Sequence, residues 1–319
     1  MVAYFRKIVR SGLCSYTVAL PKEWVERHKI KKGEVISIIE ADQGLLISPS
    51  VKQEEEHKEK ECRINIDALS GKTIQQEIIA SYLNNYTQIV LTGETITRHT
   101  KDIKNFASKL VGVELIEEDS KKIILRCYLH LSDASPGQTL RRIDNILRSM
   151  LIDSKSIPTD PALIDAIYDR TESLNKFVHL MNRVLKEALR NEGIAKQLNL
   201  SPADILIYSG LLIHLGKISF GIKRYIHDVQ KLATSKKNIQ KMLELMEDFQ
   251  KLYENAMKSF YTNDTQLADS VIKGQDILSK KCNAFEESIN TIYAAHLSIR
   301  IKTMLTHVAD ITHLTRSER

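Results

Sequence analysis

The sequence predicts a multidomain α+β protein that consists of a short N-terminal β domain, a small α/β module and a large C-terminal helical domain. Three observations support this prediction. Before residue 50, apolar and polar residues alternate in short runs, which is the period of a half-buried strand. Over residues 62–130, expected strands and helices alternate, as in a small α/β module. From residue 137 onward, apolar residues recur at steps of three and four, the spacing of helices that pack in a bundle.

The composition is that of an ordinary globular protein. The 319 residues are 43% hydrophobic and 27% charged, which is enough apolar material for two or three domains. The net charge of +6 favours an acidic partner without identifying it. The four cysteines have no paired spacing, which favours reduced thiols in the cytoplasm over a disulfide framework or a zinc knuckle. These cysteines are Cys14, Cys62, Cys127 and Cys282.

No segment of the sequence indicates membrane insertion. The first residues lack the apolar stretch of a signal peptide. The most apolar long stretch, residues 205–222, contains His214 and Lys217 and is flanked by charged residues, so a buried helix is favoured over a membrane span. We therefore expect a cytoplasmic protein without membrane insertion.

The N-terminal domain is expected over residues 1–50 as short strands and turns. Tyr16, Val18 and Leu20 lie on one face of an alternating segment, which predicts a half-buried strand that ends at Pro21. The elements expected after it are a short amphipathic helix at 22–28, a turn at Lys32-Gly33, a strand at 35–39, a hairpin turn at Asp42-Gln43-Gly44 and a last strand at 45–47.

A charged segment separates this domain from the rest of the chain. Residues 52–61 contain no aliphatic residue, which indicates a solvated linker over residues 51–61. The small α/β module is expected over residues 62–130, in the order β-α-β-α-β-β. Its strands are expected at 63–66, 88–91, 113–117 and 122–129, and its helices at 70–83 and 99–111.

One short motif in this module resembles part of a nucleotide-binding loop. Gly71, Lys72 and Thr73 match the end of a P-loop, but the upstream glycine of that motif is missing. The beginning of a helix is therefore the favoured interpretation.

The third domain is expected over residues 131–319 as six helices. Their beginnings are indicated where a capping side chain precedes a proline, at Asp160-Pro161 and Ser201-Pro202, and at Thr262-Asn263-Asp264. Short connections between long helices predict antiparallel neighbours and hence a bundle. The six helices are expected near 138–153, 161–192, 202–232, 236–261, 264–290 and 291–316.

Two parts of the chain resemble known families. The string RKIVRSGLCSYTVALPKEWVERHKIKKGEVISIIEADQGLLISP resembles the AbrB/SpoVT swapped-hairpin family. This resemblance implies that two copies interlace their hairpins into one dimer that contacts DNA. The whole arrangement is similar to archaeal PhoU-domain proteins that carry an AbrB-like head, since SYLNNYTQIVLTG and KLVGVELIEED resemble their middle segment. The resemblance implies two three-helix PhoU repeats and a link to phosphate uptake.

The N-terminal domain also carries the candidate DNA-binding residues. Residues 1–32 hold eight Lys and Arg against two acidic residues, and such cations neutralise phosphates, while arginine also reads guanine edges. The alternatives to DNA binding are an ordinary solvated surface and an N-terminal domain that only dimerises. The candidates are Arg6, Lys7, Arg10, Ser11, Lys22, Lys31 and Lys32.

No metal or cofactor is expected in this protein, because other residues stand at the ligand positions that the PhoU resemblance implies. In that family, paired carboxylates four residues apart on one helix face hold clustered metals. Here Gly216 and Phe220 stand at those positions in one repeat, and Ile299 and Thr303 in the other. A third acidic motif also lacks one carboxylate, because Asn175 stands where the family has an aspartate.

Histidines on the last expected helix offer no obvious substitute. His307 and His313 point about 120° apart on a straight helix, so one ion is not easily held by both. Polar surface positions are the favoured interpretation for these histidines and for Asp310 between them. His214 is expected to be a core or interface histidine bonded to a neighbour.

The sequence therefore predicts a homodimeric DNA-binding transcriptional regulator of phosphate uptake, whose helical domain senses a signal or binds a partner. The alternative is an adaptor that binds no DNA and regulates a phosphate transporter or a sensor kinase by protein contact. No nucleophile elbow, HExxH or CxxC motif is present, so we expect no enzyme and no catalytic residue.

Overall fold

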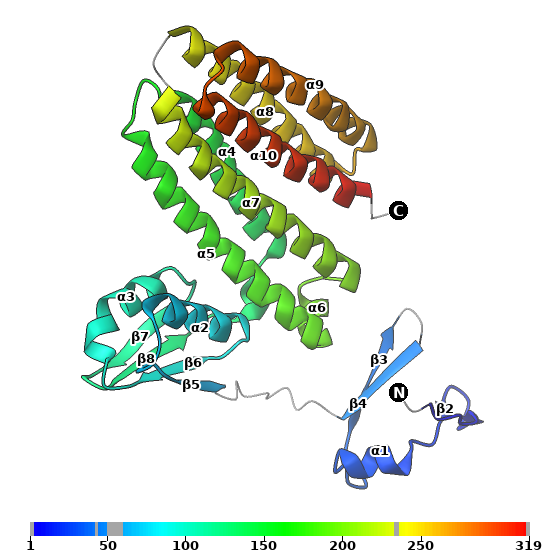
Figure 1. Ribbon diagram of the computed structural model, residues 1–319. Helices are drawn as coiled ribbons and strands as arrows, with labels where there is room; N and C mark the ends of the chain where they lie inside the picture. Colours follow the sequence, from blue (N-terminus) through cyan, green and yellow to red (C-terminus); the bar gives the residue numbers. More distant parts are fainter. Residues whose placement is uncertain (1–2, 42–43, 50–59, 233–235, 317–319) are drawn as a thin grey trace. The chain divides into compact units, whose positions relative to one another are not determined.

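A computed structural model describes residues 3–41, 44–49, 60–232 and 236–316 (Figure 1). Contacts divide the chain into two compact units, residues 1–59 and residues 60–319. We call the first unit the head and the second the body. Most of the expected linker, residues 51–61, lies outside the described residues.

The head begins with a small hairpin. Strand β1 (Val9–Arg10) pairs antiparallel with β2 (Tyr16–Thr17). Gly12, with φ at 78°, takes the left-handed conformation that a tight turn requires and that glycine adopts without strain. The strand expected to reach Leu20 is shorter than predicted, because β2 ends at Thr17 and the next residues pair with no strand among the described part of the chain.

The rest of the head follows the predicted order. Helix α1 (Lys22–Arg27) precedes an antiparallel pair, β3 (Ile36–Ala41) and β4 (Gly44–Pro49), in which Ile38 lies opposite Ile47. The first two residues of the expected hairpin turn, Asp42 and Gln43, lie outside the described residues. Among the head residues whose side chains are described, none is buried. One copy of the head therefore has no core of its own in the described part.

The body begins with the α/β module, which has the predicted β-α-β-α-β-β order. Its four-stranded sheet has the strand order β5-β6-β8-β7, in which only β5 and β6 are parallel. Helices α2 and α3 pack against each other, and isoleucine and leucine side chains from helices and strands form one core. The elements are β5 (Glu61–Asn65), α2 (Gly71–Leu83), β6 (Gln88–Thr92), α3 (Ile96–Ser108), β7 (Val113–Glu118) and β8 (Lys122–Cys127).

Helix α2 begins where the P-loop-like residues lie. The Ser70 side chain accepts a hydrogen bond from the backbone N–H of Thr73 at 3.2 Å, which caps the first turn. Gly71, Lys72 and Thr73 are thus the first turn of a capped helix, in agreement with the favoured interpretation.

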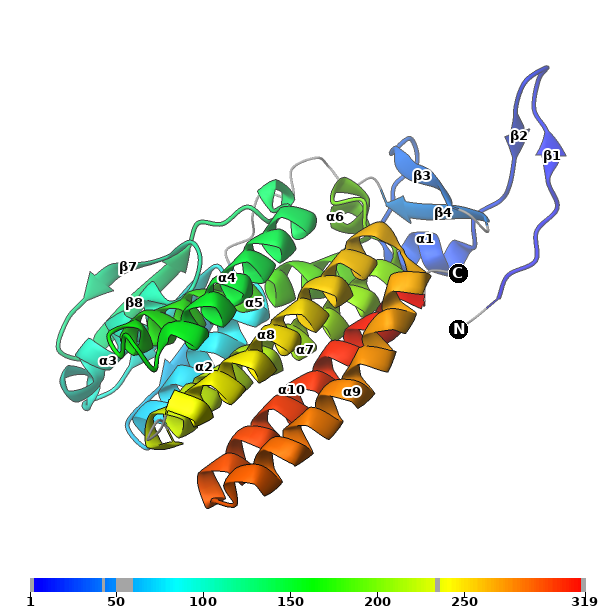
Figure 2. The same ribbon diagram turned by 90° about the horizontal axis from the view of Figure 1, so that it is seen from above.

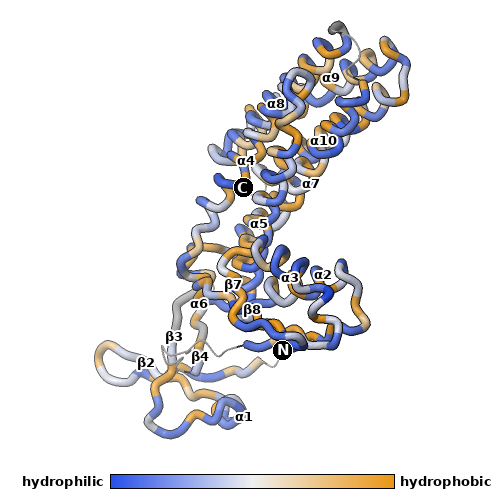
Figure 3. The backbone as a smooth tube through the Cα atoms, turned by 90° about the vertical axis from the view of Figure 1, so that its left-hand side faces the viewer, coloured by the Kyte–Doolittle hydropathy of each residue, from blue (hydrophilic) through white to orange (hydrophobic). Residues whose placement is uncertain are grey.

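Long helices make up the rest of the body. Helices α4, α5 and α7 pack on one another, helices α8, α9 and α10 do the same, and α7 lies along α10 and joins the two sets (Figure 2). Hydrophilic and hydrophobic stretches alternate along these helices, as bundle helices require (Figure 3). Their bounds are α4 (Pro136–Ser156), α5 (Leu163–Arg190), α7 (Pro202–Leu232), α8 (Lys236–Thr262), α9 (Thr265–Ile289) and α10 (Ile292–Arg316).

Two details of the helical prediction are wrong. A short helix that the sequence analysis missed, α6 (Glu192–Gln197), follows α5 and is capped by the side chain of Asn191. The expected cap at Asp160 is not one, because Asp160 accepts a hydrogen bond from the N–H of Ala162 in a turn and α5 begins only at Leu163. The expected beginnings at Ser201 and Asp264 are confirmed by hydrogen bonds from Asp204 and Leu267 N–H groups.

Helix α7 is the central helix of the bundle. It is long and apolar enough to cross a membrane, and it is the only such helix among the described residues. The core helix of a bundle has the same properties, and Leu215, Ile218 and Ile222 of α7 are fully buried against neighbouring helices.

Polar contacts fasten the module to the bundle. The buried Arg183 guanidinium of α5 donates a hydrogen bond to the backbone carbonyl oxygen of Tyr82 at 2.5 Å. The same guanidinium lies 4.6 Å from the centroid of the Tyr82 ring. Beside it, Lys186 donates to the Asn84 side chain at 2.6 Å. These contacts fix the C-terminal end of α2 on α5.

Candidate nucleic-acid interface

All seven candidate DNA-binding residues are exposed on the head. Arg6 and Lys7 precede β1, Arg10 ends β1 and Ser11 begins the hairpin turn. The three lysines lie elsewhere on the head: Lys22 begins α1, and Lys31 and Lys32 lie in the turn before β3. The structure thus groups the two arginines, Lys7 and Ser11 on one segment of six residues, 6–11.

The hairpin orders part of this group. The Ser11 N–H donates to the carbonyl oxygen of Ser15 at 2.9 Å, which closes the turn. The Arg10 guanidinium reaches the carbonyl oxygen of Leu13 at 3.5 Å, and the Arg6 guanidinium donates to the carbonyl oxygen of Phe5 at 3.1 Å. Both guanidinium groups keep further N–H groups for an outside acceptor, since each has five.

One of the candidate cations has an acidic partner, and a second candidate contacts a carboxylate only through its backbone. Lys22 lies 3.7 Å from Glu26 on the same face of α1, and the Lys31 N–H donates to the Glu34 carboxylate at 2.8 Å. Within the described residues, no carboxylate pairs with the hairpin cations. Among the seven candidates, only the Lys22 ammonium has a carboxylate partner within the described residues, and three of the unpaired cations, Arg6, Lys7 and Arg10, lie together at the first hairpin.

The head also exposes an unusual amount of apolar surface. Phe5 is 91% exposed and Leu13 is 90% exposed, although burial of a large side chain stabilises a fold by about 1.5 to 3 kcal/mol. The large apolar side chains exposed on the head are Tyr4, Phe5, Ile8, Val9, Leu13, Tyr16, Val18, Val35, Ile38 and Leu45. Such a surface is expected where another chain covers it.

The body holds a polar cluster that the sequence analysis did not assemble. His214 of α7 lies beside His307 and Asp310 of α10, with 3.4 Å between the two Nδ1 atoms. Burial lowers the pKa of both histidines, and the neighbouring His214 lowers the pKa of His307 further. His313, the other histidine of α10 near His307 in the sequence, is exposed and lies outside this cluster.

Two buried carboxylates serve the packing of the bundle. Asp144 of α4 accepts hydrogen bonds from the Tyr253 hydroxyl at 2.7 Å and from Arg148 at 3.0 Å. Burial and the Asp144 charge raise the pKa of Tyr253 well above its usual value. Asp228 of α7 lies 3.4 Å from the Arg300 guanidinium of α10. Each carboxylate therefore joins two helices.

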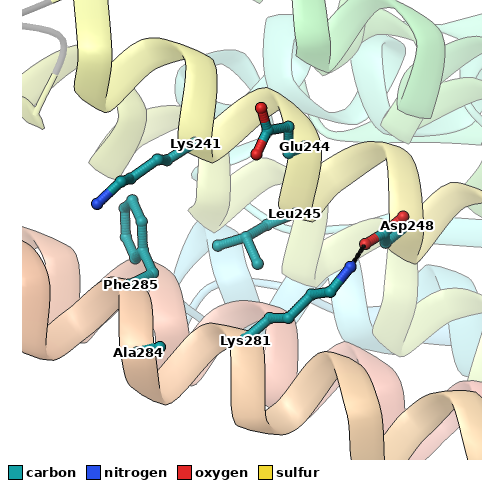
Figure 4. Close-up of a pocket in the computed structure, with 7 residues that line it drawn as sticks. All are labelled: Lys241, Glu244, Leu245, Asp248, Lys281, Ala284 and Phe285. Atoms are coloured by element: carbon teal, nitrogen blue, oxygen red, sulfur yellow. Dashed lines mark hydrogen bonds and ion pairs between the residues drawn. The ribbon is translucent and has the colours of Figure 1, made fainter.

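Two hollows of the body contain contacts between its own side chains. A cavity of about 310 Å³ lies between α8 and α9 (Figure 4), where the Lys281 ammonium crosses to the Asp248 carboxylate at 2.6 Å. A wider hollow of about 660 Å³ between α4 and α5 contains Arg142, which stacks 4.2 Å from the Phe177 ring centroid.

Comparison with known proteins identifies only the head. Residues 15–55 match the family model of MazE, a bacterial antitoxin described as acting in antidote-toxin recognition. No curated protein and no solved structure matches the chain. The match includes β2, α1, β3 and β4, and it stops before the body. The N-terminal domain is thus MazE-type and AbrB-like, which at this coarse level indicates a DNA-binding regulator.

Proposed function

We propose that the protein is a cytoplasmic transcriptional regulator that binds double-stranded DNA as a homodimer through its head. The observation that carries this proposal is the MazE-type match over residues 15–55, next to an exposed hairpin that carries Arg6, Lys7 and Arg10 without acidic partners among the described residues. Cations in this arrangement neutralise DNA phosphates at little cost, because no existing ion pair has to be broken. The proposed function requires neither catalysis nor a cofactor.

Each candidate residue of the head would make a different contact with the DNA. Arg6 and Arg10 would contact phosphate or guanine through two parallel hydrogen bonds each. Lys7 would add a phosphate contact, and the Ser11 hydroxyl a hydrogen bond to the backbone of the DNA. The lysines at the rim of the interface, Lys22, Lys31 and Lys32, would act as weaker point charges.

A second copy would complete the head. A domain of about 50 residues buries too little apolar surface to be stable alone, and the described head residues include no buried side chain. Phe5 and Leu13 would gain the burial that one copy does not give them. We expect the full-length chain to sediment as a dimer at micromolar concentration, and residues 1–50 to do so as well; a folded monomer would contradict the proposal.

The body would act as a sensor or partner-binding domain. Its helices pack as two sets of three long helices, α4-α5-α7 and α8-α9-α10. This packing fits the two three-helix repeats that the resemblance to PhoU proteins implies. A link to phosphate uptake rests on that resemblance alone, and it is part of the proposal for that reason.

A second candidate function is that of an adaptor that acts by protein contact without DNA. One observation favours it: Leu206, Ile213 and Phe220 of α7 are 74%, 60% and 54% exposed, and their spacing of seven residues places them on one stripe of the helix. A phosphate transporter or a signalling protein would bind along this stripe.

A binding experiment separates the two candidates. Labelled genomic DNA fragments are mixed with full-length protein at low salt, and bound fragments are sequenced. Enrichment of a common sequence near phosphate-uptake genes is expected under the regulator proposal. Absence of DNA binding at low salt would contradict it and leave the adaptor as the better explanation, which substitution of Ile213 by serine would then test in a pull-down.

A further inference from the structure

Three potential metal ligands from two helices converge on one point of the bundle. The His214 Nδ1 atom lies 3.4 Å from the His307 Nδ1 atom and 3.5 Å from the Asp310 Oδ2 atom. The third side of this triangle, from His307 Nδ1 to Asp310 Oδ2, is 3.8 Å. Within the described residues, this is the only such group of histidine, cysteine and acidic side chains.

The three distances fit an ion better than they fit hydrogen bonds. Zinc holds histidine nitrogen and carboxylate oxygen at about 2.0 to 2.2 Å, so the ligand atoms of a tetrahedral site lie roughly 3.3 to 3.6 Å apart. Hydrogen bonds between such atoms are shorter, at about 2.7 to 3.2 Å. The 3.4 and 3.5 Å sides match the tetrahedral edge, and the 3.8 Å side exceeds it by a few tenths of an ångström.

We propose that His214, His307 and Asp310 bind one divalent transition-metal ion, for which Zn²⁺ is the best match of geometry and ligand type. Two imidazoles and one carboxylate are ligands that zinc takes in three-residue sites, in which the fourth position is left for water or another ligand atom. The side chains are 20%, 22% and 46% exposed, so solvent reaches the ion while most of the histidine surface is covered.

The packing of α7 on α10 holds the ligands in place. Gly210 and Gly221 lie on the same face of α7 as His214, and they let the two helices approach closely. A Cβ atom at Gly221 would lie 2.4 Å from a Met304 side-chain atom, and one at Gly210 would lie 3.3 Å from Leu314. On α10, the two remaining ligands are three residues apart and therefore share a face.

An ion at this point would join the two sets of helices. His214 belongs to the α4-α5-α7 set, and the other two ligands belong to the α8-α9-α10 set. The site lies wholly within the body, so the inference is independent of the proposed DNA binding and its failure would leave that proposal untouched.

Cobalt provides the direct test, because Co²⁺ takes zinc sites and its visible absorption bands report the coordination geometry. Full-length protein is freed of metal with a chelator, dialysed and titrated with Co²⁺, and Zn²⁺ is then added in competition. We expect one Co²⁺ per chain with the intense bands of a tetrahedral site, displaced by Zn²⁺. His214→Ala and His307→Ala should each lower the affinity more than about 100-fold, beyond the loss typical of an outer-shell change.

Two other histidines are matched controls. His313→Ala alters an exposed histidine of the same helix, and His296→Ala alters a histidine that lies 4.0 Å from Asp228 in a separate cluster. Both variants should bind Co²⁺ like the unaltered protein. Circular dichroism checks that each variant is folded. If a histidine variant does not fold, Asp310→Asn takes its place in the titration, because this change keeps the side-chain volume at a half-exposed position.

Either of two results would overturn the inference. One is the absence of Co²⁺ and Zn²⁺ binding by the folded, unaltered protein in large molar excess of the metal. The other is binding that keeps its affinity and its spectrum in folded His214→Ala and His307→Ala proteins, because the ion would then lie elsewhere.

Discussion

Replacing Arg10 by alanine is the most direct perturbation of the proposed DNA interface. Arg10 is exposed at the end of β1, and no carboxylate pairs with it among the described residues. Together with Arg6 and Lys7 it makes three cations at the first hairpin of each head, and hence six such contacts in a dimer if each one meets a phosphate. Each phosphate contact lowers the logarithm of affinity by about 0.9 for each tenfold rise in salt.

The magnitude follows from this count. With six contacts, the slope is about −5.4, and affinity should fall about 2,000-fold between 50 and 200 mM salt. Arg10→Ala removes one contact from each copy, so the slope should become about −3.6 and the same change of salt should cost about 150-fold. If Arg10 reads a base instead of a phosphate, the slope should change less, while discrimination among sequences falls.

Fluorescence anisotropy on a labelled duplex, repeated at several salt concentrations, measures these slopes. Lys22→Ala is the matched control, because Lys22 already pairs with Glu26 at 3.7 Å and its removal should change the slope less. Sedimentation must first establish that each variant has the oligomeric state of the unaltered protein. Equal affinities, slopes and sequence preferences for Arg10→Ala, Arg6→Ala and the unaltered protein would refute the reasoning.

Two further predictions concern the body. Tyr253→Phe removes the 2.7 Å hydrogen bond to the buried Asp144 carboxylate, which keeps its hydrogen bond from Arg148. Urea unfolding should therefore show that the free energy of unfolding falls by about 1 to 3 kcal/mol. An unchanged midpoint and slope would contradict a stabilising role of this hydrogen bond. Burial raises the pKa of Cys282 to about 12, which leaves almost no reactive thiolate at pH 8. Mass spectrometry after iodoacetamide treatment should therefore find the exposed Cys14 alkylated in folded protein and Cys282 alkylated only after unfolding. Equal alkylation rates of Cys14 and Cys282 in folded protein would contradict the burial of Cys282.

Local patterns made most of the elements predictable. The β-α-β-α-β-β order of the module and the long helices of the bundle follow from periodicity within each segment, which does not depend on distant contacts. Helix α6 was missed because a helix of six residues has too few turns for a periodic pattern. The Asn191 side chain that caps it was the one available signal. At Asp160 the residue types of a cap were present, but the side chain serves a turn ahead of the helix.

The functional sites were predictable to different degrees. The cations of the head are adjacent in the sequence, so a count of charges found them. His214 and His307 are 93 residues apart, and only the pairing of α7 with α10 brings them together. On the last helix alone, His307 has only His313 as a histidine neighbour; the two point apart, and His313 faces solvent. Ligands from different helices become visible once the helix packing is known, because no local spacing encodes it.

That helix packing itself can be tested with two glycines of α7. An alanine in a helix interior is favoured over glycine by about 1 kcal/mol, and this gain should apply equally at Gly216 and Gly221. At Gly216 a new Cβ meets nothing within 4 Å, whereas at Gly221 it would lie 2.4 Å from the buried Met304 side chain. Overpacking of this kind costs about 1 to 3 kcal/mol. Urea unfolding should therefore show Gly216→Ala to be more stable than the unaltered protein, and Gly221→Ala to be less stable than Gly216→Ala by that cost. Because the helix-propensity gain cancels between the two variants, their difference isolates the contact of α7 with α10. Equal stabilisation of both proteins would mean that the two helices do not approach closely at Gly221, and the convergence of His214 with the ligands on α10 would lose its structural basis.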